Sequence, residues 1–528
     1  MPTTGLGQGH AAPVAVLWEC LSNFHGDEVF RARLALRNTS GRPIAPGWAV
    51  YFNTCRKVVP GSVTQGYALE HVNGDLFRLT ETGPPRQWLP GDVRTLHYAA
   101  SFWAISHTDA PLGFYLVPGD DAPALDLGDP EIVPFTRAEQ LHRHAGDRVP
   151  PADAAARFED NLGLALQPAN EVGRITPRPV FAELIDVPCA LGGDANITHD
   201  PALENEAALL RTMLGAASTG REGAVVLELG PVEVPGVPAS GEAYLLDAQP
   251  GLVRIRGVTP HGVFNGIQTL GQLLDPETGE LPAGRVLDAP RFPYRGMMLD
   301  VARHFADVET VMRLLDCMAR YKLNRFHFHL TDDEGWRLAI SALPELTEVG
   351  ARRGVGGDAQ PCLPPSFGSG PDTERAGGSG FYTAGDFIAI LRYAHARHIE
   401  VIPEFNLPGH ARAAVVAMRV RYERLMAQGR PEEAGRYLLS DPDDASQYES
   451  VQLWHDNVIC IALPSVDRFI DTVVAEVKSL YERAGVPLRT VHTGGDEVPA
   501  GAWLGSPLCR ARMREHGWTD VEQLREDF

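Results

Sequence analysis

The sequence has few cysteines and no long apolar run, and both deficits narrow the class of protein. Seven cysteines are scattered over 528 residues, and no two of them form a Cys-x-x-Cys pair. This pattern argues against a zinc-binding module and against a disulfide scaffold. No apolar stretch approaches the about 20 residues that a membrane-spanning helix needs. We therefore expect no membrane among the partners.

Basic residues are also outnumbered. The chain has 47 Lys and Arg against 68 Asp and Glu, which gives a formal net charge of −21. An acidic balance along the chain argues against nucleic acid as a partner and fits a neutral substrate. Residues 1–9 lack the basic region of a signal peptide, which predicts a cytoplasmic protein. A start site assigned too far downstream would instead allow a periplasmic or secreted protein.

The composition changes twice along the chain, which predicts three domains. In residues 1–165, short apolar runs separated by turn signals such as Asn38-Thr-Ser-Gly41 predict a β-sandwich followed by a linker. In residues 166–290, strands alternate with two helices, which indicates a small α+β domain. In residues 291–528 the order is βαβα, the repeat of a (β/α)8 TIM barrel.

Aromatic residues are frequent in the first domain. Such side chains either fill the core of a sandwich or form a flat face on which sugar rings stack. The sequence favours a role in the core, and a sugar-binding face stays the alternative. The residues concerned are Trp18, Trp48, Tyr51, Phe52, Trp88 and Trp103.

The third region contains only four recognisable βα units. A closed barrel needs eight strands, and four strands leave two strand edges uncovered. We therefore expect a fragment that holds the first four to five βα units of a barrel, or a barrel that a second chain or segment completes. The four expected strands are 294–301, 325–331, 399–405 and 489–494.

The most informative motif is Thr493-Gly-Gly-Asp-Glu497, at the end of the fourth expected strand. Catalytic residues of TIM barrels lie at the carboxyl ends of strands. Repulsion between the adjacent carboxylates of Asp496 and Glu497, together with partial burial, raises the pKa of one of them and suits a general acid. The alternative is a helix start, where both carboxylates stabilise the positive end of the helix dipole.

Polar motifs also stand at the ends of the other three strands. They lie in Tyr294–Phe305, Leu323–Arg337 and Val401–His410. Together with the fourth motif they resemble the first four strand ends of family 20 β-N-acetylhexosaminidases, and Ser440–Val451 resembles the bacterial chitobiases more narrowly. The order of the three domains is also similar to that of chitobiases.

The resemblance implies an enzyme that removes terminal, non-reducing β-linked N-acetylhexosamine (GlcNAc or GalNAc) from oligosaccharides such as chitobiose. In this family the substrate's own acetamido oxygen attacks the anomeric carbon and forms an oxazolinium intermediate. By similarity, Glu497 is the general acid, and Asp496 holds the acetamido N–H group. No sequence feature indicates a metal or an organic cofactor. An oligosaccharide is the expected partner, and the sequence leaves the oligomeric state open.

Five further residues are expected in the substrate-binding site: Arg295, Asp332, His410, Glu404 and His329. The resemblance implies that Arg295 binds sugar hydroxyls from one hollow shared with the catalytic pair, with a salt bridge as the alternative. It also implies that Asp332 and His410 support the catalytic pair. His329 is either part of the site or a core histidine, and Glu404 is expected behind the site.

Two departures from the family pattern bear on these expectations. Asn406 stands where the family usually has Asp, which removes a charge that orients or protonates His410. In the family, the aromatic pocket for the N-acetyl group comes from later strands, outside these 528 residues. Because the acetamido group must be held in a near-attack geometry, we expect little or no activity from the sequence as given.

Two other functions stay open. An ordinary retaining glycosidase would need a second carboxylate about 5 Å from Glu497 as nucleophile, and Glu404 and Asp332 are the candidates. An inactive or sugar-binding remnant would follow from an incomplete barrel. Turnover of a substrate without the 2-acetamido group would favour the first function, and hydrolysis of an aryl N-acetylglucosaminide would exclude the second.

Overall fold

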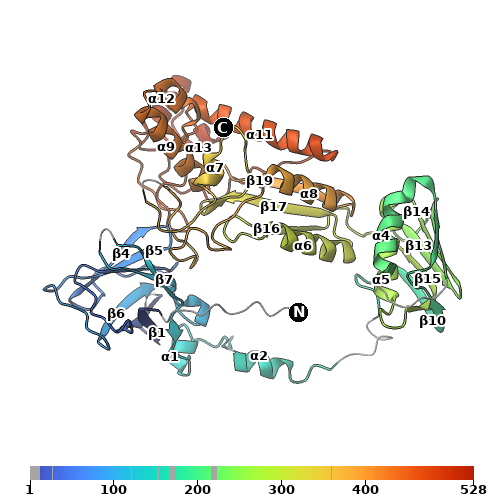
Figure 1. The fold of residues 1–528 in the computed structure, drawn as a ribbon, viewed down its shortest axis with the longest axis horizontal. Coiled ribbons are helices and arrows are strands. Elements are labelled where there is room, and N and C mark those ends of the chain that lie inside the picture. Colours follow the sequence, from blue (N-terminus) through green and yellow to red (C-terminus); the bar gives the residue numbers. More distant parts are fainter. Residues whose placement is uncertain are drawn as a thin grey trace.

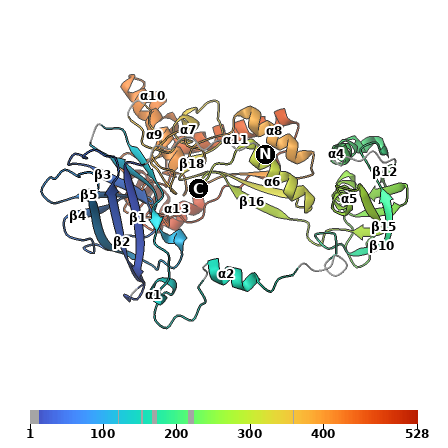
Figure 2. The same ribbon diagram turned by 60° about the horizontal axis from the view of Figure 1, so that its bottom comes forward.

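The computed structural model describes residues 12–26, 28–119, 122–151, 154–165, 173–215, 223–357 and 360–528. Residues 1–9, on which the expectation about a signal peptide rests, lie outside this part of the chain. Figures 1 and 2 show the sandwich at one end of the third domain and the middle domain at the other, with the segment around α2 (Ala154–Asn161) running between them. None of the described helices is both long and apolar enough to cross a bilayer.

The first domain is a β-sandwich, as expected. One sheet has the strand order β6-β2-β1-β9 and the other has the order β4-β5-β3-β7-β8. β8 and β9 lie in the stretch that the sequence predicted as a linker. Pairing with β7 makes β8 a strand despite its Asp and Gly, and β9 pairs with β1. The elements are β1 (Val14–Ser22), β2 (Val29–Asn38), β3 (Ala49–Asn53), β4 (Tyr67–Asn73), β5 (Leu76–Glu81), β6 (Val93–Ser101), η1 (His107–Asp109), β7 (Leu112–Val117), β8 (Leu125–Gly128), β9 (Glu131–Ile132) and α1 (Ala138–Leu141).

The aromatic side chains mainly fill the core of the sandwich. Trp18, Trp48, Phe52 and Trp88 are at most 2% exposed, and the rings of Trp48 and Trp88 lie 4.9 Å apart. Only Tyr51 and Trp103 of the expected set are partly exposed. These six residues therefore do not form a face for stacking sugar rings.

The middle domain is a six-stranded sheet with two helices on one face. The strand order is β10-β15-β13-β14-β12-β11, and α5 packs against β14, β13 and α4. Figure 1 shows both helices on the side of the sheet that faces the third domain. The elements are β10 (Phe181–Ala190), β11 (Asn196–His199), η2 (Pro201–Leu203), α4 (Glu204–Gly215), β12 (Ala224–Leu229), β13 (Tyr244–Gln249), β14 (Leu252–Gly257), α5 (Pro260–Leu273) and β15 (Glu280–Asp288).

The third domain is built on three parallel strands in the order β16-β17-β19. Helices α6, α8 and α11 pack side by side over one face of this sheet (Figure 1). The other face is open in the described residues, where Met298, beside His327, is 50% exposed. The core elements are β16 (Gly296–Asp300), α6 (Val308–Arg320), β17 (Arg325–Asp332), α8 (Ala384–His395), β19 (Glu400–Phe405) and α11 (Pro464–Ala484).

The fourth expected strand, 489–494, runs beside β19 but pairs with it through a single bridge between Glu404 and His492. Backbone hydrogen bonds of 3.0 Å join His492 N–H to the Pro403 carbonyl and Phe405 N–H to the His492 carbonyl. The segment therefore runs parallel to β19, as expected, but only one residue pair joins the two.

The longest connections of the third domain lie at the carboxyl ends of its strands. One joins β18, a two-residue strand paired with β17, to α8, and another joins β19 to α11. Their elements, and those after α11, are β18 (Gly335–Trp336), α7 (Glu345–Glu348), α9 (Arg412–Ala427), α10 (Pro431–Ala434), η3 (Gly435–Tyr437), α12 (Pro507–His516) and α13 (Val521–Asp527).

Candidate active site

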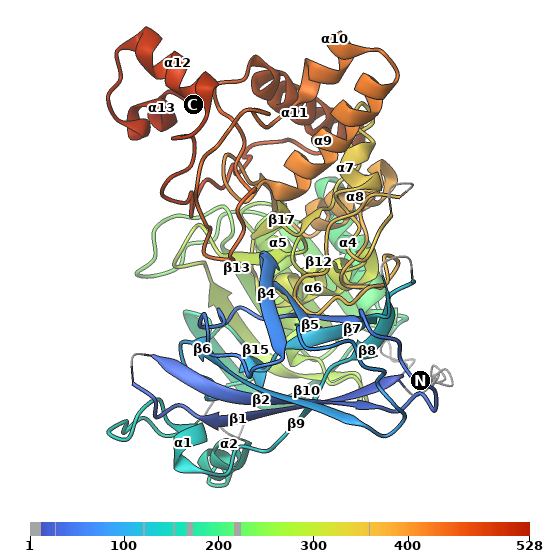
Figure 3. The same cartoon turned by 90° about the vertical axis from the view of Figure 1, so that its left-hand side faces the viewer.

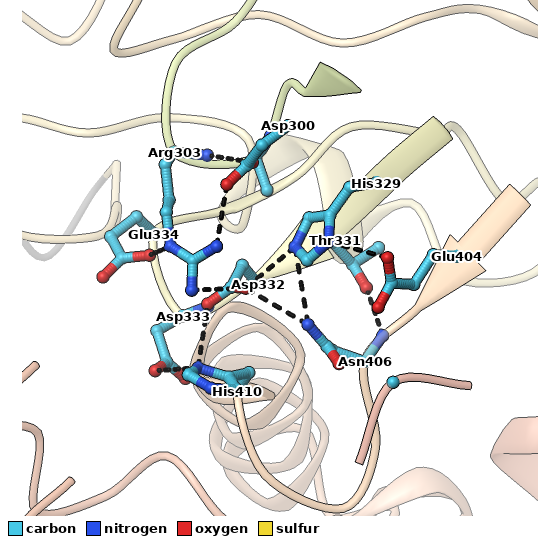
Figure 4. Close-up of polar contacts among 12 residues, drawn as sticks. Asp300, Arg303, His329, Thr331, Asp332, Asp333, Glu334, Glu404, Asn406 and His410 are labelled. Atoms are coloured by element: carbon cyan, nitrogen blue, oxygen red, sulfur yellow. Dashed lines mark hydrogen bonds and ion pairs between the residues drawn. The ribbon is translucent and has the colours of Figure 1, made fainter. Parts of the chain in front are cut away.

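Polar side chains converge at the carboxyl ends of the parallel strands (Figure 4). Asp300 ends β16, Asp332 ends β17, and Asn406 follows β19. Because the strands run parallel, their carboxyl ends meet at one edge of the sheet, where ligands bind in open α/β sheets. The geometry at this edge brings together most of the residues that the sequence singled out.

Arg303 occupies the place in this cluster that the sequence assigned to Arg295. Its Nη1 lies 2.7 Å from Oδ2 of Asp300, its Nη2 lies 3.0 Å from Oδ2 of Asp332, and its Nε lies 3.6 Å from Oε2 of Glu334. Burial alone would lower the pKa of Arg303, but the charges of Asp332 and Glu334 raise it. The guanidinium is therefore charged and held in one orientation.

The expectation for Arg295 is wrong. Arg295 precedes β16, so the five residues of that strand, about 16 Å, separate it from the carboxyl edge. Its Nε donates to the Lys322 carbonyl at 2.7 Å and its Nη1 to the Phe292 carbonyl at 2.8 Å. It also pairs with Glu242 of the middle domain. Arg295 thus ties two domains together, which is the salt-bridge alternative, and does not share a hollow with the catalytic pair.

His329 and Glu404 form a buried pair behind Asp332. Nδ1 of His329 lies 2.8 Å from Oε2 of Glu404, and its Nε2 lies 2.9 Å from Oδ2 of Asp332. Burial alone would lower the pKa of His329, but the hydrogen bonds to both carboxylates raise it to about 10. Burial alone would raise the pKa of Glu404, and its hydrogen bond with His329 lowers it instead. His329 is therefore both a core histidine and a charged member of the polar network.

His410 connects Asp332 to Glu497. Its Nδ1 lies 3.2 Å from Oδ1 of Asp332 and 3.3 Å from Oδ2 of Asp333, and its Nε2 lies 3.3 Å from Oε2 of Glu497. Burial alone would lower the pKa of His410, but the hydrogen bonds to Asp332 and Asp333 raise it to about 11. A charged imidazolium therefore faces the Glu497 carboxylate.

The three consecutive carboxyl groups at the end of β17 have pKa values that are shifted in different directions. Burial alone would raise the pKa of Asp332, but hydrogen bonds from His329 and His410 hold it well below its usual range. Burial, followed by the charges of Asp332 and Asp333, raises the pKa of Glu334 to about 8. Burial also raises the pKa of Asp333. Of these three groups, only Asp332 has a lowered pKa.

Sequence reasoning missed Arg303, Asp333 and Glu334 as site residues. All three lie in the motifs that carry the family resemblance, and two of them directly follow Asp332. Three acidic residues in a row after a buried strand were the available signal, since buried charges need partners.

Asn406 contacts Asp332, whereas the sequence suggested an effect on His410. Its Nδ2 donates to Oδ2 of Asp332 at 3.2 Å, and its Oδ1 accepts from Gly495 N–H at 3.4 Å. The charges that protonate His410 come from Asp332 and Asp333. A neutral amide here therefore leaves the charge of His410 in place.

Asp496 and Glu497 follow the bridge to β19, and both are exposed. The side chain of Glu497 is 40% exposed, so the partial burial predicted for the pair is not found. Nε2 of Gln452 donates to Oε2 of Glu497 at 2.8 Å. The alternative of a helix start is wrong, because the next helix begins only at Pro507.

Gly494 allows the chain to turn into this pair. Its φ is +62°, and a Cβ atom at this position would lie 1.5 Å from Oδ1 of Asn406. Only glycine fits both the left-handed backbone and the close approach. A larger residue at position 494 would therefore collide with Asn406 and displace the segment that carries Asp496 and Glu497.

Within the part of the chain that the structure describes, three groups of side chains have the donor atoms of a metal site. They are His71 with Glu449 and His455, His327 with Glu404 and His492, and Asp332 with Asp333 and His410. A histidine must be neutral to bind a metal. The raised pKa of His410 opposes this role in the third group, which is better explained as a network of ion pairs.

Comparison with known proteins identifies the class. Residues 292–528 match the model of the glycosyl hydrolase family 20 catalytic domain, residues 173–289 match domain 2 of that family, and residues 17–155 match a "Putative carbohydrate binding domain". These matches give the order of domains expected from the sequence: a carbohydrate-binding-like domain, a second domain and a catalytic domain.

The relatives narrow the class further. The chain is 36% identical over 515 residues to the N,N'-diacetylchitobiase of Vibrio harveyi, covering 94% of this chain and 57% of that one. It is 34% identical over 514 residues to a β-hexosaminidase of Vibrio furnissii, covering 94% and 73%. The chain therefore belongs to glycoside hydrolase family 20, as the resemblance implied, and it spans 57% of the length of the chitobiase.

A solved structure supports the fold. The chain is similar to the crystal structure of the family 20 exo-β-N-acetylglucosaminidase from Vibrio harveyi in complex with N-acetylglucosamine. The TM-score is 0.77 and the identity is 29%, over 97% of this chain and 72% of that one. The likeness covers all three domains described above.

Proposed function

We propose that this chain carries the acid–base side of a β-N-acetylhexosaminidase site, acting on terminal β-linked N-acetylhexosamine such as that of chitobiose. The observation that carries the proposal is the connection of the exposed Glu497 through His410 to the buried, ionised Asp332. The names of the relatives support the substrate class. The three parallel strands and the segment beside β19 fit the first four βα units of a (β/α)8 barrel.

Glu497 is the proton donor and acceptor in this proposal. Its carboxyl proton moves to the glycosidic oxygen as the bond from that oxygen to the anomeric carbon breaks. The acetamido oxygen of the sugar forms a bond to the same carbon, which gives the oxazolinium, while Asp496 accepts a hydrogen bond from the acetamido N–H. The Glu497 carboxylate then takes a proton from water, whose oxygen attacks the anomeric carbon and restores the acetamido group with retained configuration.

His410 stabilises the charge that Glu497 acquires in the first step. The imidazolium lies 3.3 Å from the carboxylate oxygen, and an opposite charge at that distance favours the ionised form. Asp332 and Asp333 keep His410 charged throughout. The carboxylate that Glu497 leaves after proton transfer therefore faces a fixed positive charge.

Arg303 is the proposed ligand of the sugar hydroxyls. A guanidinium has five N–H donors in a fixed fork, and the three ion pairs with Asp300, Asp332 and Glu334 involve one donor on each nitrogen. One donor on each terminal nitrogen remains. The side chain is 28% exposed, so these two donors fit a pair of vicinal hydroxyls.

The contacts of Glu404 and Asp332 argue against a protein nucleophile. Oε2 of Glu404 accepts from both His327 and His329. The Asp332 side chain is 0% exposed, and its oxygens contact Arg303, His329 and His410. A nucleophile needs a free oxygen directed at the sugar, which supports attack by the substrate's own acetamido group.

The test compares two substrates and one ligand on the full chain. We expect slow hydrolysis of 4-nitrophenyl N-acetyl-β-glucosaminide, in keeping with the low activity expected from the sequence, and no hydrolysis of 4-nitrophenyl β-glucoside. We also expect binding of the N-acetylglucosamine thiazoline, which mimics the oxazolinium. Turnover of the glucoside would favour a protein nucleophile and overturn the proposal. Binding of the thiazoline without any hydrolysis would establish a sugar-binding chain instead, and the absence of both would exclude the site.

A further inference from the structure

One turn of the sandwich domain contacts the third domain close to the candidate active site. It consists of Asn73, Gly74 and Asp75, between β4 and β5. Figures 1 and 3 show β4 and β5 at the side of the sandwich nearest to the third domain. Nδ2 of Asn73 donates to Oδ1 of Asp456 at 2.8 Å, and Gly74 N–H donates to the Leu453 carbonyl at 3.1 Å. The turn is therefore hydrogen-bonded to the connection between β19 and α11.

Gly74 packs directly on the ring of Trp454. Its φ is +60°, and a Cβ atom there would lie 2.4 Å from Cη2 of Trp454. Trp454 is 1% exposed, and its Nε1 donates to Oε1 of Glu334 at 2.9 Å. The guanidinium carbon of Arg412 lies 4.4 Å from the centroid of the Trp454 ring. A single side chain thus separates the sandwich from the carboxyl group that pairs with Arg303.

The same connection contacts Glu497. Gln452, which donates to Glu497 at 2.8 Å, lies two residues before Trp454. Ser450 closes this short turn, since its N–H donates to the Trp454 carbonyl at 2.8 Å and its Oγ accepts from Trp454 N–H at 3.1 Å. Because the turn is closed, a displacement of Trp454 also displaces Gln452.

Asp75 connects the sandwich to a second loop. Its buried carboxylate accepts from Phe367 N–H at 2.8 Å and from Ser366 Oγ at 2.9 Å. This loop belongs to the connection between β18 and α8, which also contains Arg353. Nη2 of Arg353 donates to the Arg303 carbonyl at 2.7 Å. The turn therefore contacts both connections that support Arg303, Glu334 and Glu497.

We propose that the Asn73-Gly74-Asp75 turn is a positioning element of the hydrolase, through which the sandwich domain sets the orientation of Glu334 and Glu497. The proposal rests on the proposed function and adds a role for the first domain. That domain matches a carbohydrate-binding model, yet its tryptophans Trp18, Trp48 and Trp88 are in the core. The surface that it uses here is a contact with its own catalytic domain.

Two glycines of the sandwich give a matched test. Gly61 has a φ of +73°, and a Cβ atom there meets nothing within 4 Å. Gly74→Ala and Gly61→Ala thus impose similar backbone strain, but only the first displaces Trp454. Both are made in the full chain, with hydrogen exchange of residues 449–456 and the kcat and KM for 4-nitrophenyl N-acetyl-β-glucosaminide as readouts.

We expect Gly74→Ala to speed exchange in 449–456 at least tenfold and to lower kcat at least tenfold, with KM changed less than threefold. Gly61→Ala should leave both within twofold of the parent chain. If Gly74→Ala does not fold, Asn73→Ala, which removes the side-chain hydrogen bond to Asp456, should reproduce the exchange and kcat effects in milder form. Equal exchange in the two glycine variants would overturn the positioning role. Absence of hydrolysis in the parent chain would instead overturn the proposed function, while the exchange comparison would still decide the role of the turn.

Discussion

Nε2 of His410 lies 3.3 Å from Oε2 of Glu497, while Nδ1 of the same ring lies 3.2 Å from Oδ1 of Asp332. One imidazolium thus connects an exposed carboxylate to a carboxylate whose side chain is fully buried. Its charge depends on Asp332 and Asp333. Asp332 contacts His329 of β17, Asn406 after β19 and Arg303 of the loop after β16 (Figure 4). Asp333 accepts hydrogen bonds from Arg412 N–H and from Nδ2 of Asn457, so the position of His410 depends on several segments of the third domain.

Replacing His410 should change the pH dependence of catalysis. His410→Gln removes the positive charge 3.3 Å from Glu497, which stabilises the carboxylate left by proton transfer. We expect kcat/KM to fall about 100-fold, with the alkaline limb of the pH profile moved to higher pH, because a general acid acts in its protonated form. His25→Gln, at an exposed position of the sandwich, is the control and should leave the profile unchanged. An unshifted profile for His410→Gln would show that the ring only fills space.

The two charged histidines should make stability depend on pH. The folded pKa values of His329 and His410 are raised from 6.5 to about 10 and about 11. Their contribution is therefore fully present below about pH 6.5 and is lost as the pH rises through these folded values. We expect the free energy of unfolding in urea to fall by a few kcal/mol between pH 7 and pH 10. The double variant His329→Gln, His410→Gln should lose much less over that range, and parallel losses in the two proteins would contradict the charge assignment.

The two arginines of the first motif should behave differently. Arg303→Lys replaces a fork of donors by a point charge, so thiazoline binding should weaken at least tenfold. Arg295→Lys should leave binding within twofold but lower the Tm, because it breaks the contacts with Glu242, Lys322 and Phe292. Calorimetric titration and thermal unfolding of both variants check this. Weaker binding by Arg295→Lys alone would restore the assignment made from the sequence.

A methyl group on Gly494 should disrupt the catalytic turn. The new Cβ would lie 1.5 Å from Oδ1 of Asn406, so the segment that carries Asp496 and Glu497 must move. We expect Gly494→Ala to lower kcat at least 100-fold. Gly485→Ala is the matched control, because Gly485 has a φ of +72° and open space around it. Its cost should be limited to about 1 kcal/mol of stability, and a similar kcat for the two variants would contradict the packing argument.

Local signals in the sequence predicted much of the fold. Asp307 and Thr383 are cap residues of a kind that marks helix starts in a sequence, and their side chains accept hydrogen bonds from Thr310 N–H and Asp386 N–H at the starts of α6 and α8. Such signals work because a helix cap depends on residues three apart. The parallel strands β17 and β19 were expected at 325–331 and 399–405, because short strand-like runs that alternate with helical segments indicate a parallel sheet.

The positions of the site residues could not be predicted from the motifs alone. Arg295 and Arg303 stand in one motif, and only the position of β16 between them decides which one reaches the carboxyl edge. The exposure of Glu497 and the contact between Asn406 and Asp332 depend on pairing between segments about 70 to 90 residues apart in sequence. Periodicity along a single strand does not report such distances.

The most direct test of the account is the leaving-group dependence of Glu497→Gln. Chitobiose requires protonation of its leaving oxygen, whereas 2,4-dinitrophenyl N-acetyl-β-glucosaminide has a leaving group that departs without it. We predict that the variant loses at least 1000-fold in kcat/KM on chitobiose and less than 30-fold on the dinitrophenyl glycoside. Near-normal turnover of chitobiose by Glu497→Gln, or equal losses on the two substrates, would contradict the assignment of Glu497 as the proton donor.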